Sequence, residues 1–190
     1  MMERKSEPEG ATPRRVQVDM PRGTHSSMII RSASLDDLSA IGAIYDDEVL
    51  HGTSTFDTEP RSPEAQQEWW TSHQGDRHPL LVAVDPPSGA VGWGCLSPWS
   101  LRGAYARTVE GSVFVHADHR RRGVGRALLV ALVERARTAG HRVVLGRIEA
   151  RNEPSRRMLL ELGFSSVGVM HAVGEKFGRV LDVELFELVL

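Results

Sequence analysis

Hydrophobic and polar positions divide residues 28–190 into segments with strand-like and helix-like patterns. Short apolar runs, separated by turn residues, predict seven strands. These strands lie at 28–34, 80–84, 90–99, 106–115, 142–150, 165–173 and 180–190. The turn sequence Asp85-Pro-Pro-Ser-Gly89 joins the second strand to the third, which predicts a hairpin.

Apolar residues at helical spacing predict four helices between these strands. The helices run from Ser34 to Val49, from Ser62 to about Ser72, from Gly123 to Ala139 and from Pro154 to Leu162. The third helix has the clearest pattern, an apolar stripe that ends before a glycine cap at Gly140. The stripe comprises Val124, Leu128, Leu129, Leu132, Val133 and Ala136. The predicted order is β-α-α-β-β-β-α-β-α-β-β.

The first 27 residues mix charged residues, Pro, Gly and Ser without periodicity. Such a composition favours a disordered segment, which is either a native leader or a remnant of expression. Residues 28–190 are long enough for one domain with a substantial core. We therefore expect a single domain at 28–190 and exclude 1–27 from the fold.

Charge and cysteine content narrow the function classes. The 23 basic and 25 acidic residues give a net charge of −2, which argues against nucleic acid as a partner. The single cysteine, Cys95, permits neither an intrachain disulfide nor a cysteine-based zinc site. We find no membrane span and no secretory signal, so we expect a cytoplasmic protein without membrane partners. A metal site at His116, Asp118 and His119 is also disfavoured, because no further ligand cluster lies nearby in sequence.

The most distinctive stretch joins the strand ending at Val115 to the third helix. It reads Arg120-Arg-Arg-Gly-Val-Gly125. A glycine-rich turn that enters a helix presents free backbone N–H groups and the positive end of the helix dipole. Together these groups bind phosphate, and nearby arginines add charge-assisted hydrogen bonds. The stretch therefore predicts a phosphate cradle, with a merely solvated basic turn as the alternative. It is neither a Walker A loop nor a dinucleotide fingerprint.

At this point the chain resembles the GNAT superfamily of N-acetyltransferases. The pattern Arg120-x-x-Gly123-x-Gly125 is similar to the acyl-CoA signature of that superfamily, and "RIEARNEPS" (147–155) and "LLELGF" (159–164) match its next strand and helix. The resemblance covers about 28–190. It implies an α/β (α+β) class with a GNAT-like acyl-CoA N-acyltransferase fold. That fold has a mixed, mostly antiparallel sheet of six to seven strands flanked by about four helices.

The resemblance also implies a cofactor site for acetyl-CoA as co-substrate, with no metal. Its pyrophosphate would bind at the cradle, and the pantetheine arm would lie along the strand before it. The residues assigned to this site are Phe114, Val115, Arg120, Arg121, Arg122, Gly123, Val124, Gly125, Arg126, Asn152 and Ser155. For Asn152, a helix N-cap is an equally good local interpretation.

Three further phrases are similar to the phosphinothricin and methionine sulfoximine acetyltransferase branch. They are "TSTFDTEP" (53–60), "SPWSLRGAYARTVEGSVFV" (97–115) and "GEKFGRVLDV" (174–183). The branch implies acetylation of the α-amine of a small amino acid or analogue by direct attack in a ternary complex. It also implies a homodimer. Lys176, Phe177, Gly178 and Arg179 belong to the third phrase, for which the sequence suggests no local mechanism.

The branch resemblance assigns the general base to Glu110. An ammonium cannot attack a thioester until a base removes its proton. The alternative is a solvent-facing strand glutamate, since strand alternation places polar residues on one face. Substrate contacts are assigned to Phe56, Arg102, Tyr105 and Thr108, with Arg102 as a carboxylate clamp. Core or interface roles remain open for the two aromatic residues, and an exposed loop position for Arg102.

The chain departs from the branch at three positions. Leu159 stands where relatives carry His or Tyr, so a general acid for the leaving thiolate is missing at its usual place. Glu175 replaces an aromatic residue and Val180 replaces a tryptophan. Two alternatives to the amino-acid acetyltransferase therefore stay open. One is an acetyltransferase for another amine, such as a protein N-terminus or a polyamine, and the other is a non-catalytic CoA-binding module.

Overall fold

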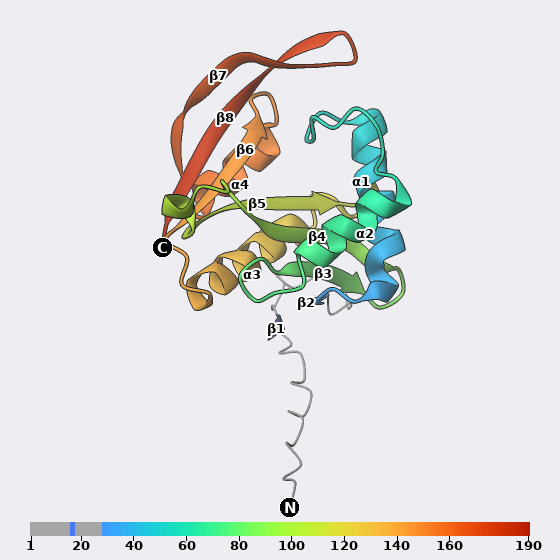
Figure 1. The fold of residues 1–190 in the computed structure, drawn as a ribbon. Helices are drawn as coiled ribbons and strands as arrows, with labels where there is room; N and C mark the ends of the chain where they lie inside the picture. The colour runs from blue at the N-terminus through green and yellow to red at the C-terminus, as the bar shows by residue number, and fades with distance from the viewer. Residues whose placement is uncertain (1–15, 18–27) are drawn as a thin grey trace, which may run out of the picture.

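The computed structural model describes residues 16–17 and 28–190 (Figure 1). Of the segment 1–27, for which the sequence predicts disorder, only Val16–Gln17 is among the described residues, and the rest of that prediction lies outside them. These two residues form strand β1 and pair antiparallel with Ile29 and Ile30. This pairing was not expected, since residues 1–27 were excluded from the fold. It covers an edge of β2 whose N–H and C=O groups would otherwise be unpaired.

The described strands form one eight-stranded sheet in the order β1-β2-β3-β4-β5-β6-β8-β7. Strands β2 to β8 cover Ile29–Ser32, Leu80–Asp85, Gly89–Pro98, Thr108–Val115, Val143–Glu149, Ser165–Lys176 and Arg179–Val189. All neighbouring pairs are antiparallel except β5 and β6, which are parallel. The predicted mixed, mostly antiparallel sheet is confirmed, with the two-residue β1 as an additional strand.

In the part of the chain that the structure describes, four α-helices lie between the strands in the predicted order. Helices α1 to α4 cover Leu38–His51, Pro63–Ser72, Val124–Thr138 and Glu153–Glu161. The short 3-10 helices η1 to η3 cover Leu35–Asp37, Gly103–Tyr105 and Ala117–His119. The Ser62 hydroxyl accepts the Ala65 N–H at the start of α2, as expected for an N-cap.

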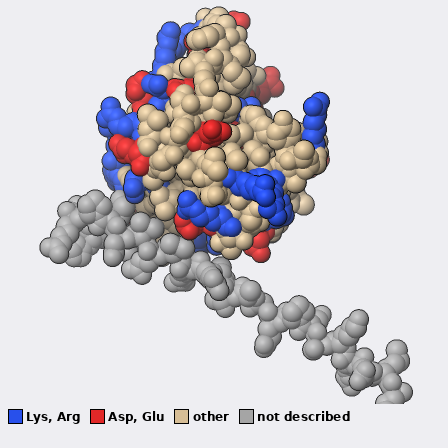
Figure 2. Space-filling view, turned by 90° about the vertical axis from the view of Figure 1, so that its left-hand side faces the viewer, with Lys and Arg blue, Asp and Glu red and all other residues tan. Residues whose placement is uncertain are grey.

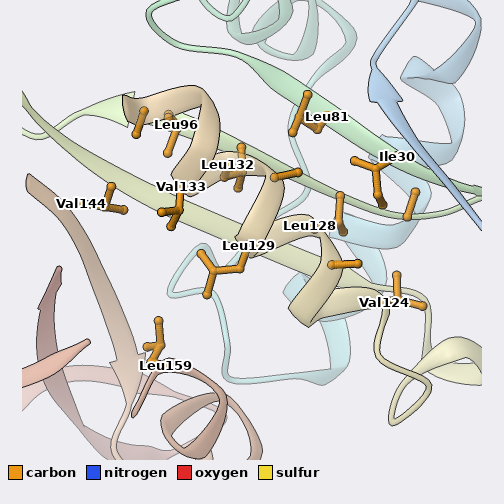
Figure 3. Packing of buried hydrophobic residues seen from close by; sticks show 14 of the residues in the cluster. Ile30, Leu81, Leu96, Val124, Leu128, Leu129, Leu132, Val133, Val144 and Leu159 are labelled. Atoms are coloured by element: carbon orange, nitrogen blue, oxygen red, sulfur yellow. The ribbon is translucent and has the colours of Figure 1, made fainter. Parts of the chain in front are cut away.

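The helices cover the two faces of the sheet. On one, which we call the α3 face, the stripe of α3 packs against β2 to β6 (Figure 3). Its cluster includes Leu128, Leu132 and Val144, each with an exposed fraction of 0%. On the opposite α1 face, α1 and α2 pack on an aromatic cluster around Trp93. The rings of Trp93 and Phe114 stack at a centroid distance of 4.8 Å.

Basic and acidic side chains are interspersed on the face of the molecule shown in Figure 2. This mixture agrees with the net charge of −2. Within the described part of the chain, no helix has the length and apolar character that a membrane crossing requires.

Candidate functional site

The parallel strands β5 and β6 separate soon after they begin. They pair only from Thr108 to Glu110 on β5 and from Val143 to Leu145 on β6. Beyond Glu110, β5 continues to Val115 with a strand partner only on its β4 side. Strand β6 instead diverges with β8 and β7, whose hairpin extends above the rest of the molecule (Figure 1). The separation leaves backbone N–H and C=O groups of β5 free to bind an extended ligand.

A pocket occupies this separation on the α3 face. Its lining is mostly apolar and comes from β5, β6, α3, α4 and the turn between α4 and β7. The lining residues are Gly111, Val113, Leu129, Leu145, Gly146, Ile148, Ser155, Met158, Leu159 and Phe164. Leu159 is 3% exposed. The position where relatives were expected to carry His or Tyr therefore forms part of an apolar wall here.

The predicted phosphate cradle has left-handed backbone at two positions. Arg121 has a φ of 63° and Gly123 has a φ of 82°, directly before the first turn of α3. Glycine adopts this conformation without steric cost, whereas arginine rarely adopts it. Arg121, Arg122 and Arg126 are exposed, and no hydrogen bond or ion pair holds their side chains within residues 28–190. The cradle therefore combines a helix N-terminus with three free guanidinium groups, which fits the diphosphate of a CoA molecule.

Arg120 differs from the other cradle arginines. Its Nη2 donates to Glu48 Oε2 at 3.0 Å, and its Nε donates to the carbonyl of Val115 at 3.1 Å. Glu48 lies on α1 and is 6% exposed. Arg120 therefore joins the cradle to α1. The sequence predicted a phosphate contact for Arg120 but not this structural one.

Glu110 projects to the α1 face. Val109 and Val113 pack on the α3 face and Phe114 on the α1 face, so alternation places Glu110 with Phe114. The carboxylate accepts two hydrogen bonds from Arg147 of β6, at 2.7 Å from Nε and 2.6 Å from Nη2. The exposed fraction is 16% for the Glu110 side chain and 53% for Arg147. Glu110 is therefore neither a free nor a solvent-facing strand glutamate.

Arg147 itself was not among the residues singled out from the sequence. The hydrogen bond with Glu110 raises the pKa of Arg147, and the ring of Trp99 lies 5.6 Å from its guanidinium carbon. The parallel register places Glu110 opposite Leu145. Arg147, two residues further along β6, is therefore the diagonal neighbour of Glu110. Sequence spacing of 37 residues gave no signal for this contact.

Two further cofactor candidates, Asn152 and Ser155, lie at the start of α4. The side chain of Asn152 caps α4, with Oδ1 accepting the Ser155 N–H at 3.2 Å, so the N-cap interpretation is confirmed. Its Nδ2 donates to Ser54 at 3.3 Å. Ser155 lines the pocket. A role for either residue toward pantetheine stays a prediction.

The model of the Acetyltransferase (GNAT) family matches residues 41–164. The chain belongs to the GNAT acetyltransferase family. It is 38% identical over 162 residues to an L-methionine sulfoximine/L-methionine sulfone acetyltransferase of Pseudomonas paraeruginosa, covering 85% of this chain and 94% of that protein. The predicted family and its N-acetyltransferase activity are thus confirmed.

Two solved GNAT structures are similar over most of the chain. One, described as a phosphinothricin acetyltransferase from Sinorhizobium meliloti in complex with acetyl-CoA, has a TM-score of 0.83 and 32% identity. That match covers 86% of this chain and 88% of the other. The second, described as a ribosomal-protein-alanine N-acetyltransferase from Brucella melitensis, has a TM-score of 0.81 and 33% identity, and covers 85% and 99%.

In this GNAT chain, the loop at 52–57 is tied to distant elements. Lys176 of β7 donates to the carbonyls of Thr55, at 2.9 Å, and Glu48, at 3.3 Å. Burial lowers the pKa of Lys176, although the charge of Glu48 opposes this shift. The Glu48 carboxylate also accepts the N–H of Ser54 at 2.8 Å. The third branch-like phrase, for which the sequence gave no mechanism, therefore includes the residue that fixes this loop.

Phe56, in the same loop, packs against β7 at Gly174. A Cβ at Gly174 would lie only 2.2 Å from the Phe56 ring, so glycine at 174 is what allows the ring to approach β7. Phe56 is 36% exposed, which leaves part of the ring available to a ligand. The sequence phrases at 53–60 and 174–183 thus meet in space, although about 120 residues separate them.

The other predicted substrate residues are more scattered. Arg102 and Tyr105 lie on the exposed loop at η2, and no described contact links either side chain to Glu110. Thr108 begins β5 and pairs with Val143, two residues from Glu110. Their roles in substrate binding stay predictions.

Cys95 lies on β4 beneath α1 and α2. Burial raises the pKa of its thiol to about 12. Such a thiol is a poor nucleophile at neutral pH, which leaves no support for an acyl-cysteine intermediate. Among the described residues, no group of three or more His, Cys, Asp or Glu side chains is placed to hold a metal ion.

Proposed function

We propose that this acetyltransferase transfers the acetyl group of acetyl-CoA to the free α-amine of a small amino acid or analogue. Acceptors of the methionine sulfone, methionine sulfoximine and phosphinothricin type fit best. The 38% identity over 85% of the chain to an enzyme named for two of these acceptors supports the proposal. A similar acetyl-CoA complex is named for the third.

The observation that carries the mechanism is the position of Glu110. Its carboxylate lies on the α1 face at the point where β5 and β6 separate, and the apolar pocket lies on the α3 face of the same separation. Acetyl-CoA would approach from the α3 face and the amine from the α1 face. The two reactants would meet across the sheet in a ternary complex, which gives the proximity that a direct transfer requires.

In this mechanism Glu110 accepts a proton from the ammonium group, directly or through water. The free amine then attacks the thioester carbonyl. Backbone N–H groups of β5 near Phe114 stabilise the developing oxyanion. As the C–N bond forms and the C–S bond breaks, the nitrogen loses a second proton, which reaches the CoA sulfur through water. A thiol pKa of about 8.5 makes the thiolate a tolerable leaving group, so Leu159 is compatible with turnover.

The cofactor assignments follow the geometry of the cradle. Arg121, Arg122 and Arg126 would contact phosphate oxygens through side chains, while Gly123, Val124 and Gly125 would do so through backbone N–H groups. The edge of β5 at Phe114 and Val115 would bind the pantetheine amides, together with Ser155 in the pocket lining and Asn152 at the start of α4. Arg120 has a smaller share in this assignment, because Glu48 and Val115 already engage its guanidinium.

A second candidate acceptor is a protein N-terminus. The similar structure described as a ribosomal-protein-alanine N-acetyltransferase favours it. Polyamines have weaker support, because Glu175, the acidic residue that suggested them, is exposed on β7. We further propose that the enzyme works in the cytoplasm as a homodimer without nucleic acid or membrane partners. Exposed apolar side chains of the β7–β8 hairpin support the dimer; they include Val167, Val169, Met170, Val173 and Val180.

The test follows CoA thiol release with purified protein and a panel of acceptors. The panel contains methionine sulfone, methionine sulfoximine, phosphinothricin, common amino acids, a polyamine and an alanine-terminated peptide. We expect release with the first three, and Glu110→Gln should lower kcat roughly 100- to 10,000-fold while acetyl-CoA still binds. Release only with the peptide would favour the second candidate. Equal turnover by the Glu110→Gln variant would refute the assignment of the base.

A further inference from the structure

The ion pair between Glu110 and Arg147 leaves part of the guanidinium unused. Arginine has five N–H donors, and the two hydrogen bonds to Glu110 occupy one edge of the group, formed by Nε and Nη2. No other described residue accepts a hydrogen bond from Arg147. The adjacent edge, formed by Nη1 and the outer Nη2–H, is therefore free to hold a second carboxylate.

The surroundings orient the guanidinium of Arg147 and leave it accessible. Arg147 is 53% exposed, so a ligand on the α1 face can reach it. Trp99 flanks the guanidinium, and Glu110 fixes its plane through two bonds. A planar group that is already oriented loses little conformational entropy when it binds a ligand.

We infer that Glu110 and Arg147 together bind the zwitterionic end of an α-amino acid, with the α-carboxylate on Arg147 and the α-ammonium on Glu110. The charges of the pair mirror those of the ligand, and both partners lie side by side on one face of the sheet. Binding the carboxylate at the free edge leaves the Glu110–Arg147 bonds intact. The same guanidinium then orients both the base and the amine that it deprotonates. The inference rests on the proposed function, because it requires an α-amino acid as acceptor.

Other arginines are less suited to this task. Arg102, the clamp expected from the sequence, is the exposed N-cap of η2 and has no described contact with Glu110 or Arg147. Arg61 lies on the α1 face, but the rings of Tyr45 and Trp69 stack on its guanidinium at 4.3 and 4.7 Å. Only Arg147, among the described arginines, is bonded to the proposed base.

The experiment compares kcat/KM for L-methionine sulfone with that for its α-carboxamide, which keeps the amine but lacks the charge. The enzymes are wild type, Arg147→Gln, Arg147→Lys, Arg102→Gln as the competing clamp, and Arg142→Gln as the control at an exposed arginine. The acid-to-amide ratio is kcat/KM for the sulfone divided by kcat/KM for its carboxamide. Any difference in amine pKa between the two acceptors is the same for every enzyme. A change in this ratio between enzymes therefore reports recognition of the α-carboxylate. Acetyl-CoA affinity and thermal unfolding are measured for each variant.

We expect Arg147→Gln to lower the acid-to-amide ratio roughly 10- to 100-fold, mainly through KM of the acid. Arg147→Lys should retain part of the preference, because it keeps the charge but loses the fork. It also replaces Arg147→Gln as the test if that variant fails to fold. Arg142→Gln should leave the ratio unchanged, and Arg102→Gln should lower it less than Arg147→Gln does.

Three results would overturn the inference while leaving the proposed function standing. The ratio could stay at the wild-type value in the Arg147 variants, or Arg102→Gln could abolish it instead. Equal loss of kcat for acid and amide would mean that Arg147 only positions Glu110. If wild type acetylates none of the amino-acid acceptors, both the proposed function and this inference fail.

Discussion

The two faces of the sheet are stabilised by different kinds of contact. On the α3 face, the stripe of α3 packs on strands through side chains that are almost all aliphatic. On the α1 face, an aromatic cluster is accompanied by buried charged residues, among them Glu48, Glu149 and Lys176. Their partners are far away in sequence: 121 residues separate Lys176 from Thr55, and 72 separate Arg120 from Glu48. The face proposed for CoA thus depends on local helical pattern, and the face proposed for the acceptor depends on long-range polar contacts.

The largest expected effect is on the α3 face. Leu132→Ala removes a fully buried side chain from the middle of the stripe. We expect a loss of about 3 kcal/mol in the free energy of unfolding, from lost burial and the cavity left behind. Urea unfolding measures it, with Leu101→Ala as control because that side chain is 99% exposed. Equal stability of the two variants would show that the stripe does not carry the fold.

The cradle offers the next test of the α3 side. Arg121→Glu together with Arg122→Glu should weaken acetyl-CoA binding roughly 10- to 100-fold, through lost charge-assisted bonds. Calorimetry measures the Kd, and the control reverses two other exposed arginines, Arg142 and Arg179. If both double variants lose affinity alike, the effect is one of net charge and the cradle assignment fails.

Arg120→Glu is expected to behave differently from the other cradle variants. It would place a second carboxylate against buried Glu48 and remove a link between α1 and the cradle. Thermal stability should therefore fall along with acetyl-CoA affinity, whereas the double variant of Arg121 and Arg122 keeps its stability. If Arg120 acted only on the ligand, Arg120→Glu would lower acetyl-CoA affinity and leave thermal stability unchanged.

The difference between the two faces also explains which features of the fold and the site could be predicted from the sequence. The element order, the helix of the apolar stripe and the turn at Gly123 follow from periodicity and backbone preferences within a few residues. The family followed from an ordered set of short phrases. All of these features depend on neighbours in the chain.

The partners on the α1 face could not be reached in the same way. The pairing of Glu110 with Arg147 depends on how β5 and β6 align before they separate, and one shifted residue would move Arg147 to the other face. The contact of Lys176 with the loop at 52–57 depends on where the β7–β8 hairpin lies. The branch resemblance therefore assigned a substrate contact to Arg102, which stays a prediction, whereas nothing in the sequence pointed to the contact of Arg147 with Glu110.

A variant of Lys176 examines the polar contacts of the α1 face directly. Lys176→Met removes the donor to the carbonyls of Thr55 and Glu48 without a large change in volume. We expect a loss of about 1–2 kcal/mol in stability, because the two carbonyls lose their partner. KM for the amine should rise as the loop loosens, and acetyl-CoA affinity should not change. Glu175→Gln, at the exposed neighbouring position, is the control. A change in acetyl-CoA affinity instead would show that the two faces are not separable.

The smallest effect is a pH dependence at the start of α1. Asp37 is 7% exposed and accepts hydrogen bonds from Arg31, at 2.6 and 2.8 Å, and from the backbone and hydroxyl of Ser34. Burial alone would raise the pKa of Asp37, but the bonds from Arg31 and Ser34 outweigh it and lower the pKa below its usual value.

Since the pKa is lower in the folded state, the ionised carboxylate stabilises the fold above the unfolded value of about 3.9. That contribution is lost as the pH falls through the lower folded pKa. Asp37→Asn should therefore be less stable than wild type by about 1 kcal/mol near pH 7, and the difference should shrink below about pH 4. Urea unfolding at several pH values measures it, with the exposed Asp76→Asn as control. A difference that stays constant down to pH values near 2 would mean that the hydrogen bonds of Asp37, and not its charge, hold α1 to β2.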